Sequence, residues 1–436
     1  MLILLPGGQP HILRLPGIRL SFREAPLTGP LLAALVPPEL ELDVRYVDGS
    51  VSPIPLGEPF DLVAISVITG MAPRAYELAA LFRARGATVI LGGIHVTLLP
   101  DEAAQHADAI AVGYAETLWP RMLRDWVAEH LKPRYEHRGP PVLDGLPAPR
   151  TDLQKPFGYA MPRTVNATRG CRQQCDFCVA PAAPLSWATR PVGDVIADIR
   201  RLRGRSFVFH DLNLTDDVEY AKELFAAMLP LRRRWGGLVS TRVVRDKELL
   251  DLMARAGCSY LLIGFETVNA EALGTMRKRF NSAVPYADVV AALHARRIVV
   301  QGCFIFGLDE DTPEVFDATV DAIDALGIDI PRFALYTPFP GTAAFNRLQA
   351  EDRLLHRDWS FYDTQHTVIR PARMTPAELD AGFIRAWRDC YRLPRIARRL
   401  RLRRHPGIVG VGNLAYRLYS RKLGHDNNRF PDGVTT

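Results

Sequence analysis

Short apolar runs alternate with longer amphipathic stretches in two parts of the chain, and this alternation limits the possible folds more than any other feature. In the first part, up to about residue 130, the runs are rich in valine, isoleucine and leucine, as the buried strands of parallel sheets are. They are MLILL, LDVRYV (Leu42–Val47), DLVAISV (Asp61–Val67), ATVILGG (Ala87–Gly93) and DAIAVG (Asp108–Gly113). Parallel strands joined by helices form doubly wound sheets, so we predict an α/β domain of this class over residues 1–130.

The second part, residues 163–350, alternates in the same way and predicts a barrel. Its apolar runs are RTVNATR, SFVFHD (Ser206–Asp211), GLVSTR (Gly237–Arg242), YLLIGFE (Tyr260–Glu266), VVQGCFIFG (Val299–Gly307) and PRFALYTP (Pro331–Pro338). These runs predict a partial (β/α)6 barrel of TIM type, in which the chemistry collects at the carboxyl ends of the strands. Residues 131–162, between the two parts, hold many prolines and few periodic apolar residues, which indicates an extended linker.

Three cysteines stand in a CxxxCxxC array within GCRQQCDFC, namely Cys171, Cys175 and Cys178. Three thiolates this close on one loop can hold three irons of a cubic iron–sulfur cluster and leave the fourth iron open. A zinc site is the alternative, but structural zinc sites usually close with a fourth ligand, and the nearest histidine in sequence, His210, lies far downstream. The remaining cysteines are scattered and are expected to be buried thiols: Cys258, Cys303 and Cys390.

The cysteine array and its neighbours resemble the radical S-adenosylmethionine (SAM) enzymes. Phe177, before the last cysteine, matches the aromatic position that packs near the adenine in that superfamily. Four more segments recur in the family's order and spacing: FVFHDLNLTDD (Phe207–Asp217), IGFETVN (Ile263–Asn269), GCFIFGLDEDT (Gly302–Thr312) and TPFPGT (Thr337–Thr342). The resemblance implies a [4Fe-4S] cluster whose open iron binds SAM, an external electron donor, and an adenine that lies along the fifth strand at Gly302 and Phe304.

The polar groups of SAM need partners at the strand ends. Asp211 and Asn213 are expected to accept hydrogen bonds from its amino group. Arg242 is expected to pair with its carboxylate through the guanidinium fork, and Glu266 to bind the ribose or the amino group. The acidic run Asp309–Asp311 is expected instead to cap the following helix.

The first domain resembles the Rossmann-like cobalamin-binding domain that is fused ahead of some radical SAM enzymes, most closely in VILGGIHVTLLPDEA. Three features fall at the carboxyl ends of its strands, where ligands of such sheets bind. They are Ser66 to Thr69 with the loop through Pro73, Gly92–Gly93, and Gly113–Glu116. The resemblance implies that Ser66 and the glycine pair cradle the nucleotide tail of cobalamin.

One motif departs from the larger cobalamin family. The DxHxxG motif, which supplies a histidine to cobalt, is absent from Gly7–Ser21. We therefore expect the lower face of the cobalt to have no histidine from that motif and to face the Thr69–Pro73 loop. His95 is expected to be a satisfied histidine at the sheet edge more than a cobalt neighbour. A domain of this type that no longer binds a corrinoid is the alternative.

The charge is concentrated in one segment. The chain of 436 residues carries a net charge of +6, but Arg385–Lys422 holds eleven arginines and one lysine against one aspartate, a local charge of +11. Residues 351–436 are expected to form a strand-like flap (DWSFYDTQHTVIRP) and a helical extension that Thr375 begins as N-cap. The Arg-rich stretch predicts either a helix packed by one face on the barrel, or a contact with anionic lipid or a phosphorylated substrate. No base-reading module accompanies it, so no nucleic-acid partner is expected.

The combined prediction is a cobalamin-dependent radical SAM enzyme. The activity that the resemblance implies is methylation of an unactivated carbon, in which a 5′-deoxyadenosyl radical removes a hydrogen and methylcobalamin supplies the methyl group. The alternatives are a corrinoid-dependent cyclase or oxidative enzyme, and a non-catalytic iron–sulfur or corrinoid sensor. The substrate is expected to be a small or lipid-like molecule. No long apolar run or signal-peptide pattern is present, so we expect a cytoplasmic protein, with the Arg-rich tail as a route to the inner membrane face.

Overall fold

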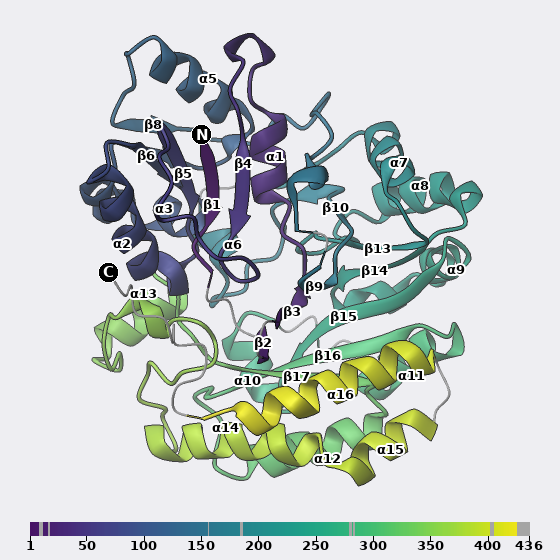
Figure 1. The fold of residues 1–436 in the computed structure, drawn as a ribbon. Helices are drawn as coiled ribbons and strands as arrows, with labels where there is room; N and C mark the ends of the chain where they lie inside the picture. The colour runs from purple at the N-terminus through teal and green to yellow at the C-terminus, as the bar shows by residue number, and fades with distance from the viewer. Residues whose placement is uncertain are drawn as a thin grey trace.

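The computed structural model describes the chain except for residues 8–11, 16–17, 156, 184–185, 279–280, 282–283, 402–404 and 425–436. Two six-stranded sheets hold most of the described strands, and helices lie against both (Figure 1). The carboxy-terminal helices α14 and α16 contact the last strand of the second sheet (Figure 1).

The first domain is a doubly wound parallel sheet, as predicted, with the strand order β4-β1-β5-β6-β7-β8. The strands are β1 Leu2–Leu5, β4 Arg45–Asp48, β5 Leu62–Ser66, β6 Thr88–Gly92, β7 Ala109–Val112 and β8 Arg134–Glu136. The helices are α1 Thr28–Ala34, α2 Ala72–Arg83, α3 Ile94–Leu98, α4 Pro100–Ala103 and α5 Ala115–Val127. In β5, Val63 and Ile65 join the core on one face and Leu62 and Ala64 the core on the other. Burial on both faces explains why this strand is a continuous apolar run.

The second domain is the predicted partial (β/α)6 barrel, with the parallel order β10-β13-β14-β15-β16-β17. Its strands are β10 Thr164–Val165, β13 Ser206–Phe209, β14 Arg234–Val239, β15 Cys258–Glu266, β16 Val299–Phe306 and β17 Ile330–Leu335. The helices between them are α7 Val192–Arg201, α8 Val218–Met228, α9 Lys247–Arg255, α10 Ala270–Thr275, α11 Tyr286–Ala295 and α12 Val315–Leu326. Alternate strand residues, such as Phe265, Phe304 and Phe333, are fully buried in the main core.

The segment after β1 leaves the first sheet and reaches the barrel. β2 (Ile12–Leu15) and β3 (Ile18–Glu24) form an antiparallel hairpin, and β3 pairs in parallel with β9 (Tyr159–Met161). Phe22 packs edge-on against Tyr416, with ring centroids 5.7 Å apart. This is the segment in which the cobalt-binding histidine motif is absent, and its described strands connect the two domains.

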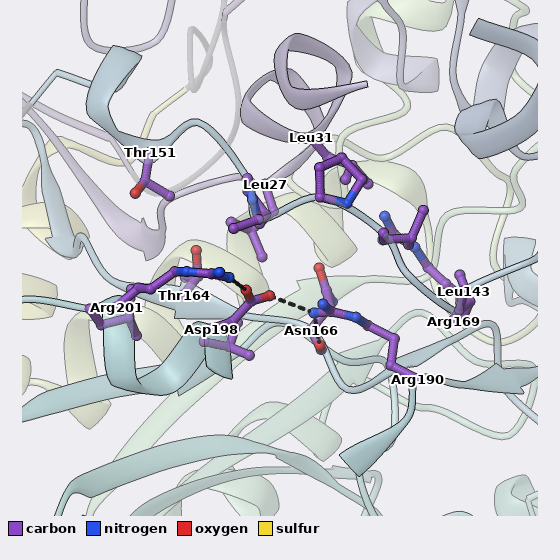
Figure 2. Close-up of a pocket in the computed structure, with 16 residues that line it drawn as sticks. Leu27, Leu31, Leu143, Thr151, Thr164, Asn166, Arg169, Arg190, Asp198 and Arg201 are labelled. Carbon is purple, nitrogen blue, oxygen red and sulfur yellow. Dashed lines mark hydrogen bonds and ion pairs between the residues drawn. The ribbon is translucent and has the colours of Figure 1, made fainter. Parts of the chain in front are cut away.

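The proline-rich segment also joins the domains. It begins with β8, which belongs to the first sheet, and its later residues enclose a cavity of about 80 Å³ against α1, β10 and α7 (Figure 2). Inside, Asp198 pairs with Arg190 at 2.8 Å and with Arg201 at 3.3 Å. Because these charged groups pair with one another, we assign this cavity a structural role at the junction.

The carboxy-terminal region is helical, with α13 Ala343–Ala350, α14 Pro376–Cys390, α15 Leu393–Arg401 and α16 Pro406–Lys422. Thr375 begins α14 through a capping box with Glu378, as predicted. The expected strand-like flap was wrong in form, because the rings of Trp359 and Tyr362 pack 4.9 Å apart and the chain turns there. Only a single bridge, between Leu354 and Ile369, pairs described residues of this segment in strand fashion.

The Arg-rich helix α15 packs on the barrel by one face. Arg395 and Arg398 both pair with Asp324 of α12, the latter at 2.9 Å. Arg399 is buried and donates to Asn413 of α16 at 3.0 Å. Part of the positive charge of Arg385–Lys422 therefore forms ion pairs and hydrogen bonds that pack α15 on the barrel. Within the described residues, no helix is long and apolar enough to cross a membrane.

Candidate functional site

The cysteine loop follows the carboxyl end of β10 and is framed by an antiparallel pair, β11 (Thr168–Arg169) and β12 (Ala188–Thr189). Cys175 is buried, Cys171 and Cys178 are half-buried, and all three are free thiols. Burial raises the pKa of Cys171 to about 12 and that of Cys175 to about 11, and the neighbouring Cys178 raises both. The three thiols are therefore close in space as well as in sequence. Because metals bind thiolates, a bound cluster has to offset the cost of deprotonation.

Among the described residues, no three Cys, His, Asp or Glu side chains form a group that could hold a single metal ion. A structural zinc site needs four ligands at about 2.3 Å or less from one point. A cubic cluster differs because each thiolate binds its own iron.

Asp216, which the sequence reasoning missed, anchors the start of the loop. Its carboxylate accepts from the thiol of Cys171 at 3.4 Å, from the backbone N–H of Arg172 at 2.9 Å and from the amide of Gln173 at 2.8 Å. The amide of Asn213 donates to it at 2.7 Å. The quoted FVFHDLNLTDD segment contains Asp216, but neither spacing nor residue type distinguishes it from its neighbour Asp217, which caps α8.

A buried ion pair lies beside the cysteines. Glu266, at the end of β15, pairs with Lys278, whose ammonium group also donates to the carbonyl of Gly264 at 3.2 Å. Burial raises the pKa of Cys175 and Cys178, and the charge of Lys278 acts in the opposite direction on both. Glu266 thus lies at the predicted strand end. Lys278 was not predicted, because its place beside the loop is set by tertiary structure.

Asp211 and Asn213 are both buried and both engaged within the chain. Asp211 accepts from the backbone N–H of Ala167 at 3.0 Å, and from both the backbone N–H and, at 2.7 Å, the hydroxyl of Thr168. Asn213 bonds Asp216 and accepts from the N–H of Ser240 at 3.3 Å. These contacts hold the strand that leads into the cysteine loop. A bond from SAM to Asp211 stays a prediction, and the carboxylate would have to share or exchange a present partner.

Arg242 lies on the turn Thr241–Arg245 after β14 and is exposed. It borders a small hollow that Asp216 and Ser240 also line. No ion pair joins its guanidinium to any residue that the structure describes. Its position leaves the guanidinium accessible to an anionic group that reaches the carboxyl end of β14.

The residues that were predicted to lie near the adenine belong to two different faces of the barrel sheet. Phe177 packs edge-on against Tyr336, with ring centroids 6.4 Å apart, and joins a cluster that includes Ile305 of β16. Phe304 is instead fully buried in the main core and stacks on Phe265 at 5.8 Å. A Cβ atom on Gly302 would come within 2.8 Å of Ile328. The position of the adenine along β16 at Gly302 and Phe304 stays a prediction. Because strand side chains alternate, Ile305, and not Phe304, shares a cluster with Phe177.

The predicted cradle in the first domain consists of Ser66 beside Gly92, which are in register on β5 and β6. Gly93 has φ 101°, and a Cβ atom there would come within 2.7 Å of the Val67 backbone. Gly113 likewise faces the carbonyl of His137. Gly93 and Gly113 are therefore explained by packing within the chain, whereas a Cβ on Gly92 would make only ordinary contact with Ala111, at 3.5 Å.

Thr69 and His95 belong to a buried network. His95 is fully buried and lies within hydrogen-bond distance of Thr69 (3.4 Å), Tyr76 (3.1 Å) and Glu102 (3.3 Å). Trp359, from the carboxy-terminal flap, donates to Glu102 at 3.1 Å. His95 is therefore the satisfied histidine that was favoured, and Thr69 is one of its partners.

The carboxyl ends of the two sheets are in contact. Glu116, at the start of α5, pairs with Arg169 beside the cysteine loop at 3.0 Å. Tyr114 donates to the carbonyl of Ser186 in the same loop region at 2.9 Å. These contacts bring the strand-end edge of the first domain to the cysteine loop of the second.

Comparison with known proteins gives matches over both domains. The signature of the Radical SAM superfamily matches residues 165–323. Bacteriochlorophyllide d C-12(1)-methyltransferase of Chlorobaculum tepidum is 33% identical over 357 residues, which are 78% of this chain and 77% of that protein. Bacteriochlorophyllide d C-8(2)-methyltransferase of the same organism is 28% identical over 83% of this chain and 84% of its own length.

Two solved structures share the two-domain fold. The radical SAM methyltransferase TsrM from Kitasatospora setae, with cobalamin and a [4Fe-4S] cluster bound, has a TM-score of 0.63 at 17% identity, over 88% of this chain and 84% of that one. The cobalamin-dependent radical SAM enzyme OxsB, with aqua-cobalamin and SAM bound, has a TM-score of 0.63 at 13% identity, over 89% of this chain and 66% of that one.

Proposed function

The chain belongs to the radical SAM proteins that carry an amino-terminal cobalamin-binding-type domain, and from this premise we propose that it methylates an unactivated carbon of a small molecule. The observation that carries the proposal is the contact between the cysteine loop and the strand-end edge of the first domain. That contact would hold two cofactors on either side of one substrate. The 33% identity to a methyltransferase over most of both chains favours methylation over the other reactions of such proteins.

The cysteine loop would hold the [4Fe-4S] cluster through Cys171, Cys175 and Cys178. When bound, the reduced cluster, SAM and cobalamin supply a radical that removes a substrate hydrogen and a methyl group that replaces it, with the electron from an external donor. Asp216 holds the backbone around Cys171, and Lys278 places a positive charge beside Cys175 and Cys178. A positive charge favours the thiolate form that a cluster requires.

The chain would bind SAM at the strand ends beside the cluster. We assign the ribose or amino group to Glu266 and the carboxylate to Arg242, whose guanidinium is accessible. Asp211 and Asn213 stabilise this edge through their hydrogen bonds to the backbone of Ala167, Thr168 and Ser240. Phe177 and Ile305 are the apolar side chains on the loop side of β16 that the adenine would meet. Excluding water from this region protects a radical intermediate from side reactions.

Cobalamin would lie on the edge formed by Ser66 and Gly92. Both end neighbouring strands, and the small Gly92 leaves room for a bulky group to approach the backbone. His95 is fully buried and bonded within the first domain, so it would not reach cobalt without breaking that network. The nearby Thr69–Met71 turn is covered by the flap, since a Cβ on Gly70 would come within 3.0 Å of the Tyr362 carbonyl. We therefore expect that His95 does not bind cobalt.

Anaerobic reconstitution of the full chain with iron, sulfide and hydroxocobalamin tests the proposal. With a strong reductant and SAM that carries a trideuterated methyl group, we expect 5′-deoxyadenosine and transfer of the label to cobalamin. Cys171→Ala is expected to lose 5′-deoxyadenosine formation but to retain cobalamin. Cleavage of SAM without any methyl transfer would favour the cyclase, and a protein that binds cofactors but cleaves no SAM would favour the sensor.

We also infer that α16 touches an anionic membrane surface. Its outer face exposes Ile408, Val411, Leu414 and Leu418, of which Val411 is 71% exposed. Arg421 and Lys422 are exposed at the end of the same helix. Apolar side chains beside cations are typical of helices that lie at a lipid interface. The alternative is a helix that packs on the barrel by one face and makes no contact with lipid.

A further inference from the structure

An apolar cavity of about 400 Å³ lies at the amino-terminal ends of the barrel strands, away from the cysteine loop. Its inner wall comes from the first residues of successive strands, including Phe207, Trp235, Tyr260 and Ile330. Protein interiors contain few voids larger than a water molecule, and large apolar cavities are the usual places for ligands. The proposed reaction uses the opposite ends of these strands, so this cavity is separate from the site described above.

Two segments from distant parts of the chain cover the cavity. Leu20 and Phe22 come from the β2–β3 hairpin, and Ile408, Val411 and Ala415 come from α16. Helix α16 contacts both β2 and β17, so it spans the open side of the barrel beside the last strand (Figure 1). The exposed face of Val411 connects the cavity lining with the surface, which provides an entrance for an apolar molecule.

The inner end of the cavity is closed by a polar group of three side chains. Gln301 donates to the hydroxyl of Tyr416 at 3.3 Å and accepts from the hydroxyl of Tyr260. Because these three side chains already hydrogen-bond one another, a ligand in the cavity need not supply hydrogen-bond partners for them. They also separate the cavity from Cys303, which lies two residues further along β16 toward the cysteine loop.

The outer part of the lining carries a cation. Arg163 lines the cavity, and its Nε donates to the carbonyl of Ser206 at 2.9 Å. No acidic side chain pairs with it in the part of the chain that the structure describes. The guanidinium therefore has donors left for an acidic group, and none of the lining residues is an aspartate or glutamate.

We propose that this cavity binds the single hydrocarbon chain of an anionic amphiphile, with its carboxylate at Arg163. The volume accommodates roughly a dozen methylene groups if each takes about the 30 Å³ of a water molecule. An apolar lining with one cation near its edge matches a fatty acid better than a neutral or a cationic molecule. The site is independent of the proposed methyl transfer.

Fluorescence titration of the reconstituted full chain with cis-parinaric acid tests the site. We expect saturable binding, and a loss of affinity of about tenfold or more in Ala415→Phe, because the larger ring fills the cavity. Val127→Phe is the control, since Val127 is exposed on α5 and does not line the cavity. Arg163→Gln is expected to weaken binding of the acid but not its displacement by dodecanol, which has no charge.

Three results would overturn the proposal: no saturable binding, equal binding in Ala415→Phe and the wild type, or equal loss in Ala415→Phe and Val127→Phe. Iron content and the thermal midpoint show whether Ala415→Phe has folded. If it has not, Ile408→Trp narrows the entrance from a partly exposed position that the fold tolerates. Binding that is seen only with phosphatidylserine vesicles, and not with free acid, would assign this surface to the membrane and not to a chain inside the cavity.

Discussion

Glu266 combines two energetic costs at one residue. Its φ of 67° is in the left-handed region, which costs a residue with a side chain about 1–3 kcal/mol. Its carboxylate is also buried and depends on Lys278 for its charge partner. Strain and buried charge persist where the surrounding structure enforces them, and they cluster at functional sites. Here both occur beside two of the three cysteines.

Replacing Lys278 by methionine tests this pair. The variant leaves a buried carboxylate without its partner, so we expect a loss of about 3–5 kcal/mol in the free energy of unfolding. Removing the cation beside Cys175 and Cys178 should also lower the iron content after reconstitution. Denaturant titration under anaerobic conditions and iron analysis measure both. Lys247→Met, at an exposed helix start, is the control and should match the wild type.

At the scale of elements, arginines hold α15 onto the barrel. Asp324 of α12 is almost fully buried and receives Arg395 and Arg398, and the buried Arg399 lies 3.6 Å away. The sequence of α15 is typical of a helix at a lipid interface, but its arginines attach it to the barrel through ion pairs. The apolar outer face of α16 remains the surface that lipid could meet.

Asp324→Asn should loosen α15 without unfolding the barrel. The substitution keeps the size of the side chain but removes the charge that three arginines share, one of them buried. We expect a loss of about 3–5 kcal/mol in local stability and faster amide hydrogen exchange over Leu393–Arg401. Asp321→Asn is the matched control, because Asp321 is exposed and, among the described residues, pairs with Arg395 alone. Equal exchange in the two variants would contradict this account.

Over the whole molecule, the two domains meet through the carboxyl ends of their strands. The Glu116–Arg169 pair and the Tyr114–Ser186 bond join these edges, and the flap packs on the first domain through Trp359. The β2–β3 hairpin makes a second connection at the other end of the barrel. A substrate between the edges would therefore be enclosed by both domains.

Membrane contact is a property of the whole molecule and can be measured by sedimentation with vesicles. We expect the full chain to bind vesicles that contain phosphatidylserine and to dissociate at high salt, because the attraction to anionic lipid is screened. Val411→Ser with Leu414→Ser should reduce binding by about tenfold or more, since each apolar side chain contributes about 1.5–3 kcal/mol when buried. Val127→Ser removes a similarly exposed residue from α5 and should have no effect. Equal binding by all variants would exclude α16 as the contact.

The fold class and the cysteine cluster could both be predicted from the sequence, because both depend on local information. Strand–helix alternation dictates parallel sheets, and three cysteines within eight residues are close in any compact fold. The side chains that surround the cysteines could not be predicted in this way, because they depend on packing between distant segments. Lys278 and Asp216 reach the cysteine loop from other segments, and His95 finds partners on three different elements. Phe304 and Ile305 are neighbours in the sequence, yet their side chains point to opposite faces of the sheet. The packing of the sheet decides which of these faces lies in the main core. Long-range packing sets these positions, and its partners are not neighbours in the chain.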